Sequence, residues 1–69
     1  MNKALELSLK TAPNDPGCYI YRDKDGEILY IGKAKNLRNR VNQYFKERDE
    51  RPKILFMLDQ IESIEFIKT

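Results

Sequence analysis

The spacing of apolar residues at the start of the chain predicts a short helix followed by a break. Leu5 and Leu9 lie four positions apart within residues 2–10, which places both on one side of a helix. Residues 11–17 then contain two prolines and a glycine, a combination that cannot continue a helix. The pattern therefore predicts one short helix and a turn before the next element.

Two short segments that favour β-structure follow, and together they predict a hairpin. Residues 17–22 contain tyrosines that alternate with other residues, as in a half-buried strand, and residues 27–31 have a similar composition. The four residues between them, 23–26, form a turn in which Gly26 can take a positive φ. So short a connection joins antiparallel neighbours. We expect Gly32 to end the second strand.

Two helices and a third strand are predicted for the rest of the chain. Asn36 is a suitable N-cap for a helix whose apolar side comprises Leu37, Val41, Tyr44 and Phe45. Pro52 suits the first turn of the next helix. The apolar side of that helix comprises Leu55, Leu58 and either Ile61 or Phe56. Residues 63–68 form the third strand, with Ile64 and Phe66 on one face.

This order of elements predicts a small α+β domain, in which a three-stranded antiparallel sheet is flanked by helices. A chain of 69 residues forms one domain at most, over residues 1–69. The last predicted strand is followed by no helix that could complete the cover of the sheet. We therefore expect the chain to be a fragment that is incomplete at its C-terminus.

Composition excludes several kinds of chemistry. The chain has no histidine and one cysteine, Cys18, so an internal disulfide, a Ser-His-Asp triad and a Cys-His pair are excluded, and a zinc site is disfavoured. Acid–base chemistry is left to carboxylates, Lys, Tyr or a metal-bound water. No apolar run approaches the ~20 residues that span a membrane, and the charged N-terminus does not resemble a signal peptide. We expect a cytoplasmic monomer without a membrane partner.

Charge is unevenly distributed along the chain, although the net charge is only +2. Residues 33–53 carry eight Lys and Arg against three Asp and Glu, whereas residues 54–69 carry one against three. A local excess of positive charge suits a polyanion such as nucleic acid. A solvated helix face explains the same pattern equally well.

Two short motifs resemble the paired signature of the GIY-YIG nuclease family. Gly17-Cys18-Tyr19 is similar to the first half, with Cys18 in place of the middle Ile, and Tyr30-Ile31-Gly32 is similar to the second. The run GKAKNLRNRV, which starts at Gly32, is most similar to the N-terminal domain of UvrC, the incision subunit of bacterial nucleotide excision repair. The resemblance extends over residues 12–69 and implies the GIY-YIG endonuclease fold.

The resemblance implies a metal-dependent DNA endonuclease, which uses Mg²⁺ or Mn²⁺ and makes the 3′ incision with other excision-repair subunits such as UvrB. It also implies that a Glu beyond Thr69 binds the metal, so that no metal ligand lies within this chain. Such a fragment is expected to bind Mg²⁺ weakly and to cut DNA poorly or not at all. A homing or restriction endonuclease of the same family, a non-catalytic DNA-binding module and an inert scaffold are the alternatives.

By position, the resemblance implies catalytic roles for Tyr19, Tyr30, Lys33, Arg40 and Tyr44. Tyr19 would help to deprotonate the attacking water. A free phenol is a weak base at neutral pH because its pKa is about 10, and a neighbouring cation stabilises its ionised form. Arg40 can grip two phosphate oxygens with its planar fork, and it lies one helical turn from Tyr44. Taken singly, the tyrosines could also be packing residues, Lys33 a solvated charge, and Arg40 the partner of a carboxylate.

Contacts to the DNA backbone are expected from four further cations, Lys35, Arg38, Lys46 and Arg48. Such contacts do not depend on base sequence and weaken as salt rises. Cys18 and Tyr21 are assigned structural roles.

Overall fold

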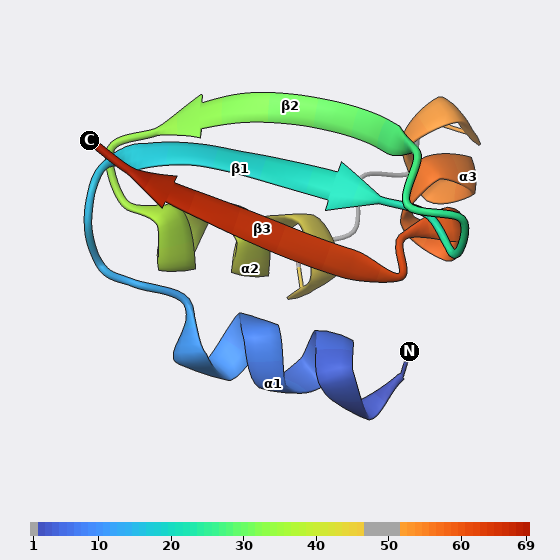
Figure 1. Cartoon of the computed structure of the whole chain (residues 1–69), viewed down its shortest axis with the longest axis horizontal. Helices are drawn as coiled ribbons and strands as arrows, with labels where there is room; N and C mark the ends of the chain where they lie inside the picture. The colour runs from blue at the N-terminus through green and yellow to red at the C-terminus, as the bar shows by residue number, and fades with distance from the viewer. Residues whose placement is uncertain (1, 47–51) are drawn as a thin grey trace.

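The computed structural model describes the backbone of residues 2–46 and 52–69 and the side chains of residues 2–45 and 56–69. Its elements, in chain order, are α1 (Lys3–Thr11), β1 (Gly17–Arg22), β2 (Ile28–Ala34), α2 (Leu37–Lys46), α3 (Pro52–Gln60) and β3 (Ser63–Lys68). This order confirms the predicted α+β architecture (Figure 1). No described helix is long and apolar enough to cross a membrane.

The sheet is antiparallel, and the first strand lies at its centre. The strand order is β2-β1-β3, so β1 pairs with β2 through the hairpin and with β3 from the end of the chain. Gly26 has a φ of 82° in the hairpin turn, as its position predicted. The prediction that Gly32 ends β2 was wrong. Because β1 begins at Gly17, whose partner is Ala34, pairing continues past the glycine.

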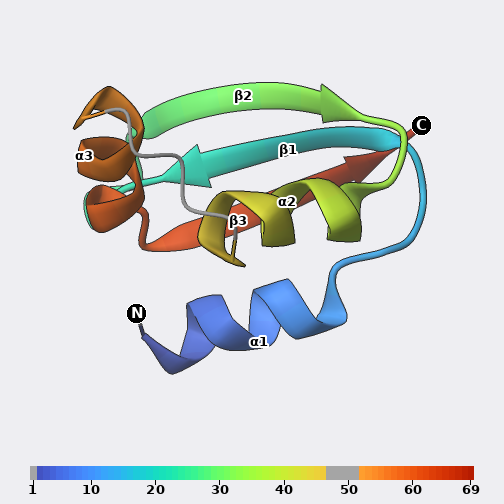
Figure 2. The ribbon, with the colours of Figure 1, turned by 180° about the vertical axis from the view of Figure 1, so that it is seen from behind.

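The helices α1 and α2 lie together on one side of the sheet, and α3 lies at the end of the sheet near the hairpin turn (Figures 1 and 2). Tyr19 and Tyr21 of β1 join the core on the helix side, where both are at most 1% exposed. Side chains alternate along a strand, so neighbouring residues face the other way. On that face Ile31 and Ile67 are 54% and 48% exposed. The sheet therefore has one face in the core and one partly open to solvent.

Helix α1 begins one residue later than predicted, and Asn2, which the predicted helix included, is its cap. The Asn2 side chain accepts a hydrogen bond from the Leu5 amide at 2.6 Å. Leu5 and Leu9 are both buried in the core, which confirms the predicted apolar side.

Helix α2 docks on α1 through side chains that bind backbone carbonyls. Arg38 donates from Nε to the Ala12 carbonyl at 2.8 Å and from Nη2 to the Lys10 carbonyl at 2.9 Å. Asn42 donates from Nδ2 to the Leu9 carbonyl at 3.1 Å. These carbonyls lie at the C-terminal end of α1, where helix carbonyls lack intrahelical partners. The two helices are thus joined by polar bonds as well as by their apolar sides.

The apolar side of α2 was also predicted correctly. Asn36 caps the helix by accepting from the Asn39 amide at 3.0 Å. Leu37 and Val41 are fully buried, and Tyr44 and Phe45 pack against the core half-buried.

In the described part of α3 and just after it, the apolar residues differ in burial. Leu58 and the following Ile61 are buried, whereas Phe56 is 70% exposed, so the open choice between Ile61 and Phe56 is decided for Ile61. The side chain of Leu55 lies outside the described residues.

Candidate active site

All four tyrosines of the chain meet on the helix side of the sheet. Tyr19 and Tyr21 come from β1, Tyr30 from β2 and Tyr44 from α2. The six distances between their ring centroids all lie between 5.2 and 6.4 Å. We call these four side chains the tyrosine cluster.

The strand register assembles the cluster, and a glycine makes room for it. Tyr21 lies opposite Tyr30, and Tyr19 lies opposite Gly32, so all of these positions share one face. A Cβ added at Gly32 would overlap the Tyr19 hydroxyl and Cζ and would come within 2.9 Å of Cε1. The Tyr19 phenol therefore lies directly against the backbone of β2, and any side chain at position 32 would displace it.

Arg40 brings a positive charge to the edge of the cluster. Its Nε donates to the Tyr19 hydroxyl at 3.4 Å, and the Tyr19 hydroxyl donates to that of Tyr44 at 3.5 Å. The guanidinium carbon also lies 5.5 Å from the centroid of the Tyr44 ring, within cation–π range. The hydrogen bond to Tyr19 raises the pKa of Arg40, so its charge persists. A buried phenol is thus connected to an exposed cation.

The phenols differ in their exposure to solvent. Tyr19 is 1% exposed, Tyr44 is half-buried, and Tyr30 is 41% exposed. Burial, and then the hydrogen bond with Tyr19, raises the pKa of Tyr44. Burial also raises the pKa of Tyr21 far above the ordinary value. The cluster therefore reaches from the core to the surface, with Tyr30 and Arg40 at the exposed end.

Lys33 does not join the tyrosines. It lies opposite Cys18 in the sheet, so its side chain belongs to the face away from the cluster. It does meet Arg40 in a shallow hollow of about 290 Å³ at the end of β2 and the first turns of α2. The hollow, which we call the basic hollow, is lined by Lys33, Ala34, Lys35, Asn36, Asn39, Arg40 and Gln43.

The basic hollow has the chemistry of an anion site. Three of its lining residues are cations, three are amides, and none is a carboxylate. Arg40 belongs both to this hollow and to the edge of the tyrosine cluster. The guanidinium is therefore a group through which a phosphate could contact both regions.

The four cations predicted to contact the DNA backbone have different positions. Lys35 is exposed and lines the basic hollow. Arg38 uses two of its five donor hydrogens on carbonyls of α1, which gives it a structural role beside the predicted one. The Lys46 side chain and Arg48 lie outside the described residues. Lys35 is the residue whose surroundings favour the predicted contact.

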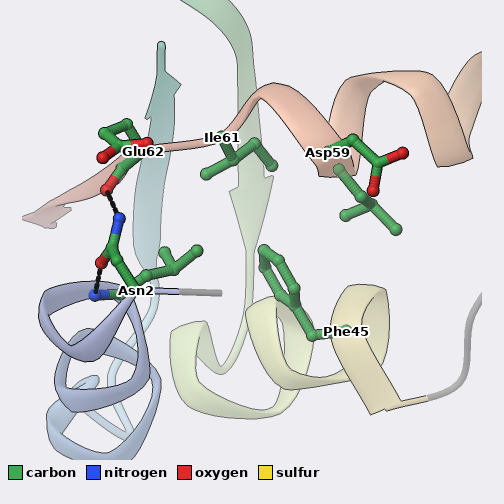
Figure 3. A pocket seen from close by; sticks show the side chains of 7 residues that line it. Asn2, Phe45, Asp59, Ile61 and Glu62 are labelled. Atoms are coloured by element: carbon green, nitrogen blue, oxygen red, sulfur yellow. Dashed lines mark hydrogen bonds between the residues drawn. The ribbon is translucent and has the colours of Figure 1, made fainter. Parts of the chain in front are cut away.

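A second, larger pocket of about 410 Å³ lies where α1 begins and α3 ends. Figure 3 shows the Phe45 ring directed from α2 toward Ile61, with Asn2 bonded to the Glu62 carbonyl. We call it the acidic pocket, and its lining residues are Asn2, Leu5, Phe45, Leu58, Asp59, Ile61 and Glu62. Its charged residues are both carboxylates, which repel phosphate. Its chemistry does not suit a polyanion, and no predicted site residue lines it.

The residues near the tyrosine cluster do not by themselves fit a divalent cation. Mg²⁺ prefers carboxylate oxygens and water. Among the described residues, no group of three or more His, Cys, Asp and Glu is placed to hold a metal ion. Phenols and fixed cations are the groups available at the cluster and the basic hollow.

Two features of this region were not predicted from the sequence. Tyr21 belongs to the cluster as fully as the other tyrosines, and its position two residues after Tyr19 was the available signal. Asn39 and Gln43 line the basic hollow beside Arg40. Gln43 lies three residues after Arg40 and four after Asn39, a spacing that places it beside both on the helix surface.

Comparison with known proteins identifies close relatives. The UvrC-like GIY-YIG domain family matches residues 15–69. The "UvrABC system protein C" of Streptococcus uberis is 46% identical over the whole chain, which spans 12% of that protein. The protein of the same name from Symbiobacterium thermophilum is 50% identical over 94% of the chain, which spans 10% of it. The chain therefore spans only a small part of the curated relatives that it matches.

Solved structures with the same fold come from Thermotoga maritima. A point mutant of the GIY-YIG N-terminal endonuclease domain of UvrC, bound to its catalytic divalent cation, has a TM-score of 0.84 and 33% identity. The match covers all of this chain and 73% of that one. The same domain bound to magnesium has a TM-score of 0.83 and 32% identity. Three mutants with a tyrosine changed to phenylalanine are also bound to the cation.

Proposed function

Since this chain belongs to the UvrC-like GIY-YIG domain family, we propose that it is a divalent-cation-dependent endonuclease domain that hydrolyses a DNA phosphodiester in bacterial nucleotide excision repair. The observation that carries the proposal is the arrangement of Tyr19, Arg40 and Tyr44. Arg40 binds the Tyr19 phenol at 3.4 Å and also lines the basic hollow. One guanidinium thus touches a phenol of the cluster and the place where a phosphate would bind.

Arg40 and Lys33 are the residues that bind the scissile phosphate in this proposal. Hydrolysis of a phosphodiester places additional negative charge on the phosphate in the transition state, and fixed cations stabilise that charge. The planar guanidinium of Arg40 can bind two oxygens, and Lys33, which also lines the hollow, adds a compact charge. Lys35 holds the neighbouring part of the DNA backbone. This set of cations would bind nucleic acid without a preference for base sequence.

Tyr19 is the base in this proposal: after its own proton has passed to solvent, its ionised oxygen accepts a proton from the attacking water. It is the one member of the cluster that both accepts from Arg40 and donates to Tyr44. The charge of Arg40 stabilises the ionised phenol, which a neutral environment of the same shape would not do. Tyr30 is 41% exposed at the mouth of the cluster, where it can contact the substrate. Tyr44 accepts the hydrogen bond of Tyr19 and supports the Arg40 guanidinium with its ring.

The divalent cation requires a ligand in this proposal, and among the described residues no group of three or more His, Cys, Asp and Glu is placed to hold it. The Thermotoga domain that binds magnesium is longer than this chain, since the match covers all of this chain and 74% of that one. We place the missing carboxylate, a Glu, beyond Thr69 in the complete domain. The same proposal includes UvrB as a partner and the 3′ position of the cut, by analogy with the repair proteins to which the chain is similar.

Nicking of supercoiled plasmid tests this function. The 69-residue chain and a version extended to the length of the Thermotoga domain are each titrated with Mg²⁺ and Mn²⁺. The extended version should nick DNA, and Arg40→Ala should lower its rate about 10²–10³-fold, the effect of removing one transition-state charge partner. Tyr19→Phe should also lower the rate. Glu62→Gln in the acidic pocket is the matched control and should leave the rate unchanged.

Three outcomes would contradict parts of the proposal. Efficient nicking by the 69-residue chain, abolished by Tyr19→Phe, would show that the metal is bound within this chain. Salt-dependent DNA binding without nicking by the extended version would instead indicate a non-catalytic DNA-binding module. An absence of DNA binding at low ionic strength would favour an inert scaffold.

A further inference from the structure

The hydroxyl of Tyr21 is buried without a hydrogen-bond partner. Tyr21 is 0% exposed, and its hydroxyl is the one buried side-chain polar atom in the described part of the chain that lacks a partner. A buried hydroxyl without a partner is destabilising, and such groups are uncommon in native proteins. Phenylalanine would fill the same space without that cost, so the hydroxyl calls for an explanation.

Three phenol rings and the ring of Phe45 contact Tyr21. Its ring centroid lies 5.2 Å from that of Tyr19, 5.5 Å from that of Tyr44 and 6.3 Å from that of Tyr30. These three phenols and the Arg40 guanidinium are the titratable groups that act on it electrostatically. From β3 the opposing residue is Ile64, which is apolar and buried. The acceptors to which the Tyr21 hydroxyl could donate are therefore the phenol oxygens of the other members of the tyrosine cluster.

We propose that Tyr21 is a positioning residue of the tyrosine cluster, whose ring sets the spacing of Tyr19 and Tyr44 and whose hydroxyl donates a hydrogen bond to a neighbouring phenol oxygen once that phenol has lost its proton. The hydroxyl thus has no acceptor while the cluster is neutral and donates when a neighbouring phenol is ionised. The proton that the neighbour loses passes to water or hydroxide, and Tyr21 keeps its own.

Three features of the site support this role. The T-shaped contact of 88° between the Tyr21 and Tyr44 rings fixes the direction of both side chains. Burial raises the pKa of Tyr21, so its hydroxyl remains protonated, and able to donate, when a more exposed phenol ionises. A bond from a hydroxyl to a charged oxygen is about twice as strong as one between neutral groups. The interaction therefore favours the ionised cluster over the neutral one, as catalysis requires.

The chain is well suited to a direct test, because its four tyrosines all belong to the cluster and it contains no tryptophan. The absorbance of tyrosinate, followed as pH is raised, reports on the cluster alone. The 69-residue chain is compared with Tyr21→Phe, which removes the hydroxyl and keeps the ring. Far-UV circular dichroism at each pH shows that the ionisation is measured on folded protein.

The expected result is that Tyr21→Phe moves the first ionisation step upward by about one pH unit, the effect of losing one hydrogen bond to a charged group. Phe45→Leu is the matched control, since Phe45 also packs on the Tyr21 ring and its loss removes no hydroxyl. It should lower the melting temperature and leave the first step in place. A first step that does not move in Tyr21→Phe, or that moves equally in Phe45→Leu, would overturn the proposal.

The catalytic meaning of this ionisation rests on the proposed function, whereas the ionisation itself does not. In the extended domain, Tyr21→Phe should shift the rising limb of the pH–rate profile upward by the same amount and leave KM for DNA unchanged. A titration shift in a chain that never cleaves DNA would remove the proposed function and leave the role of Tyr21 intact. DNA cleavage by the extended domain, together with a first ionisation step that Tyr21→Phe does not shift, would support the proposed function and overturn the role of Tyr21.

Discussion

The basic hollow and the acidic pocket border opposite ends of the same helix and differ in almost every respect. The basic hollow, of about 290 Å³, is formed by residues near the start of α2 and the end of β2. The acidic pocket, of about 410 Å³, lies beside Phe45 near the end of α2 and is lined by four apolar residues, one amide and two carboxylates. The larger of the two is the one whose charge would repel DNA.

The difference shows that charge and neighbours, rather than size, identify the candidate site. The acidic pocket adjoins buried residues of the core, such as Leu5 and Leu58. The basic hollow adjoins the tyrosine cluster through Arg40. We therefore expect substitutions at the acidic pocket to change stability alone. Substitutions at the basic hollow and the tyrosine cluster should change the chemistry of the site.

The largest expected effect is at the acidic pocket, and it should be purely structural. Leu58→Ala should lower the free energy of unfolding by about 3 kcal/mol, because it leaves a cavity in the core. Urea unfolding measures the loss. DNA affinity, measured where the variant is still folded, should equal that of the parent chain. A large drop in affinity under those conditions would break the separation between the two regions.

The second prediction concerns the cluster side of the molecule. Gly32→Ala should cost about 2 kcal/mol, as an overpacked site does, and should also displace the Tyr19 phenol from Arg40. Nicking by the extended domain should fall with it. Gly26→Ala is the control: its Cβ meets nothing within 4 Å, although its φ of 82° is unfavourable for alanine. Equal loss of nicking in both variants would show that stability alone is responsible.

A third prediction follows from the burial of Tyr21. The unfolded chain releases this proton near pH 10, whereas burial keeps it bound in the folded chain. The folded state then binds more protons, so stability is full below about pH 10 and falls above it, by about 1.4 kcal/mol per pH unit for one proton. Urea unfolding at a series of pH values from about 8 to about 11 measures the slope. Tyr21→Phe should reduce that slope, and an unchanged slope would assign the loss to other groups.

The smallest expected effect comes from removing a single charge, first from the basic hollow and then from the acidic pocket. Lys35→Ala should weaken DNA binding a few-fold and lower the slope of log affinity against log salt by about 1, as the loss of one phosphate contact does. Glu62→Gln, in the acidic pocket, should leave that slope unchanged. Equal changes in the two variants would indicate that only net charge matters. Fluorescence anisotropy over a salt series measures both.

Local pattern predicted much of this molecule. The apolar sides of α1 and α2, the cap at Asn36 and the turn at Gly26 follow from short-range chemistry, because each depends on residues within one or two helical turns. The end of β2 did not follow, because the pairing of Gly17 with Ala34 overrode the local signal of Gly32. The choice of Ile61 over Phe56 likewise depended on which residue the core could accept.

The sequence by itself determined the kinds of chemistry available: phenols and guanidinium groups, no imidazole, and a segment of concentrated positive charge. Only the tertiary structure decided which of these groups meet. It joined Tyr19, Tyr30, Tyr44 and Arg40, placed Lys33 on the other face, and buried Tyr21 without a partner. The physical reason is that residue type sets what a side chain can do, whereas register and helix packing set its neighbours, and reactivity depends on neighbours.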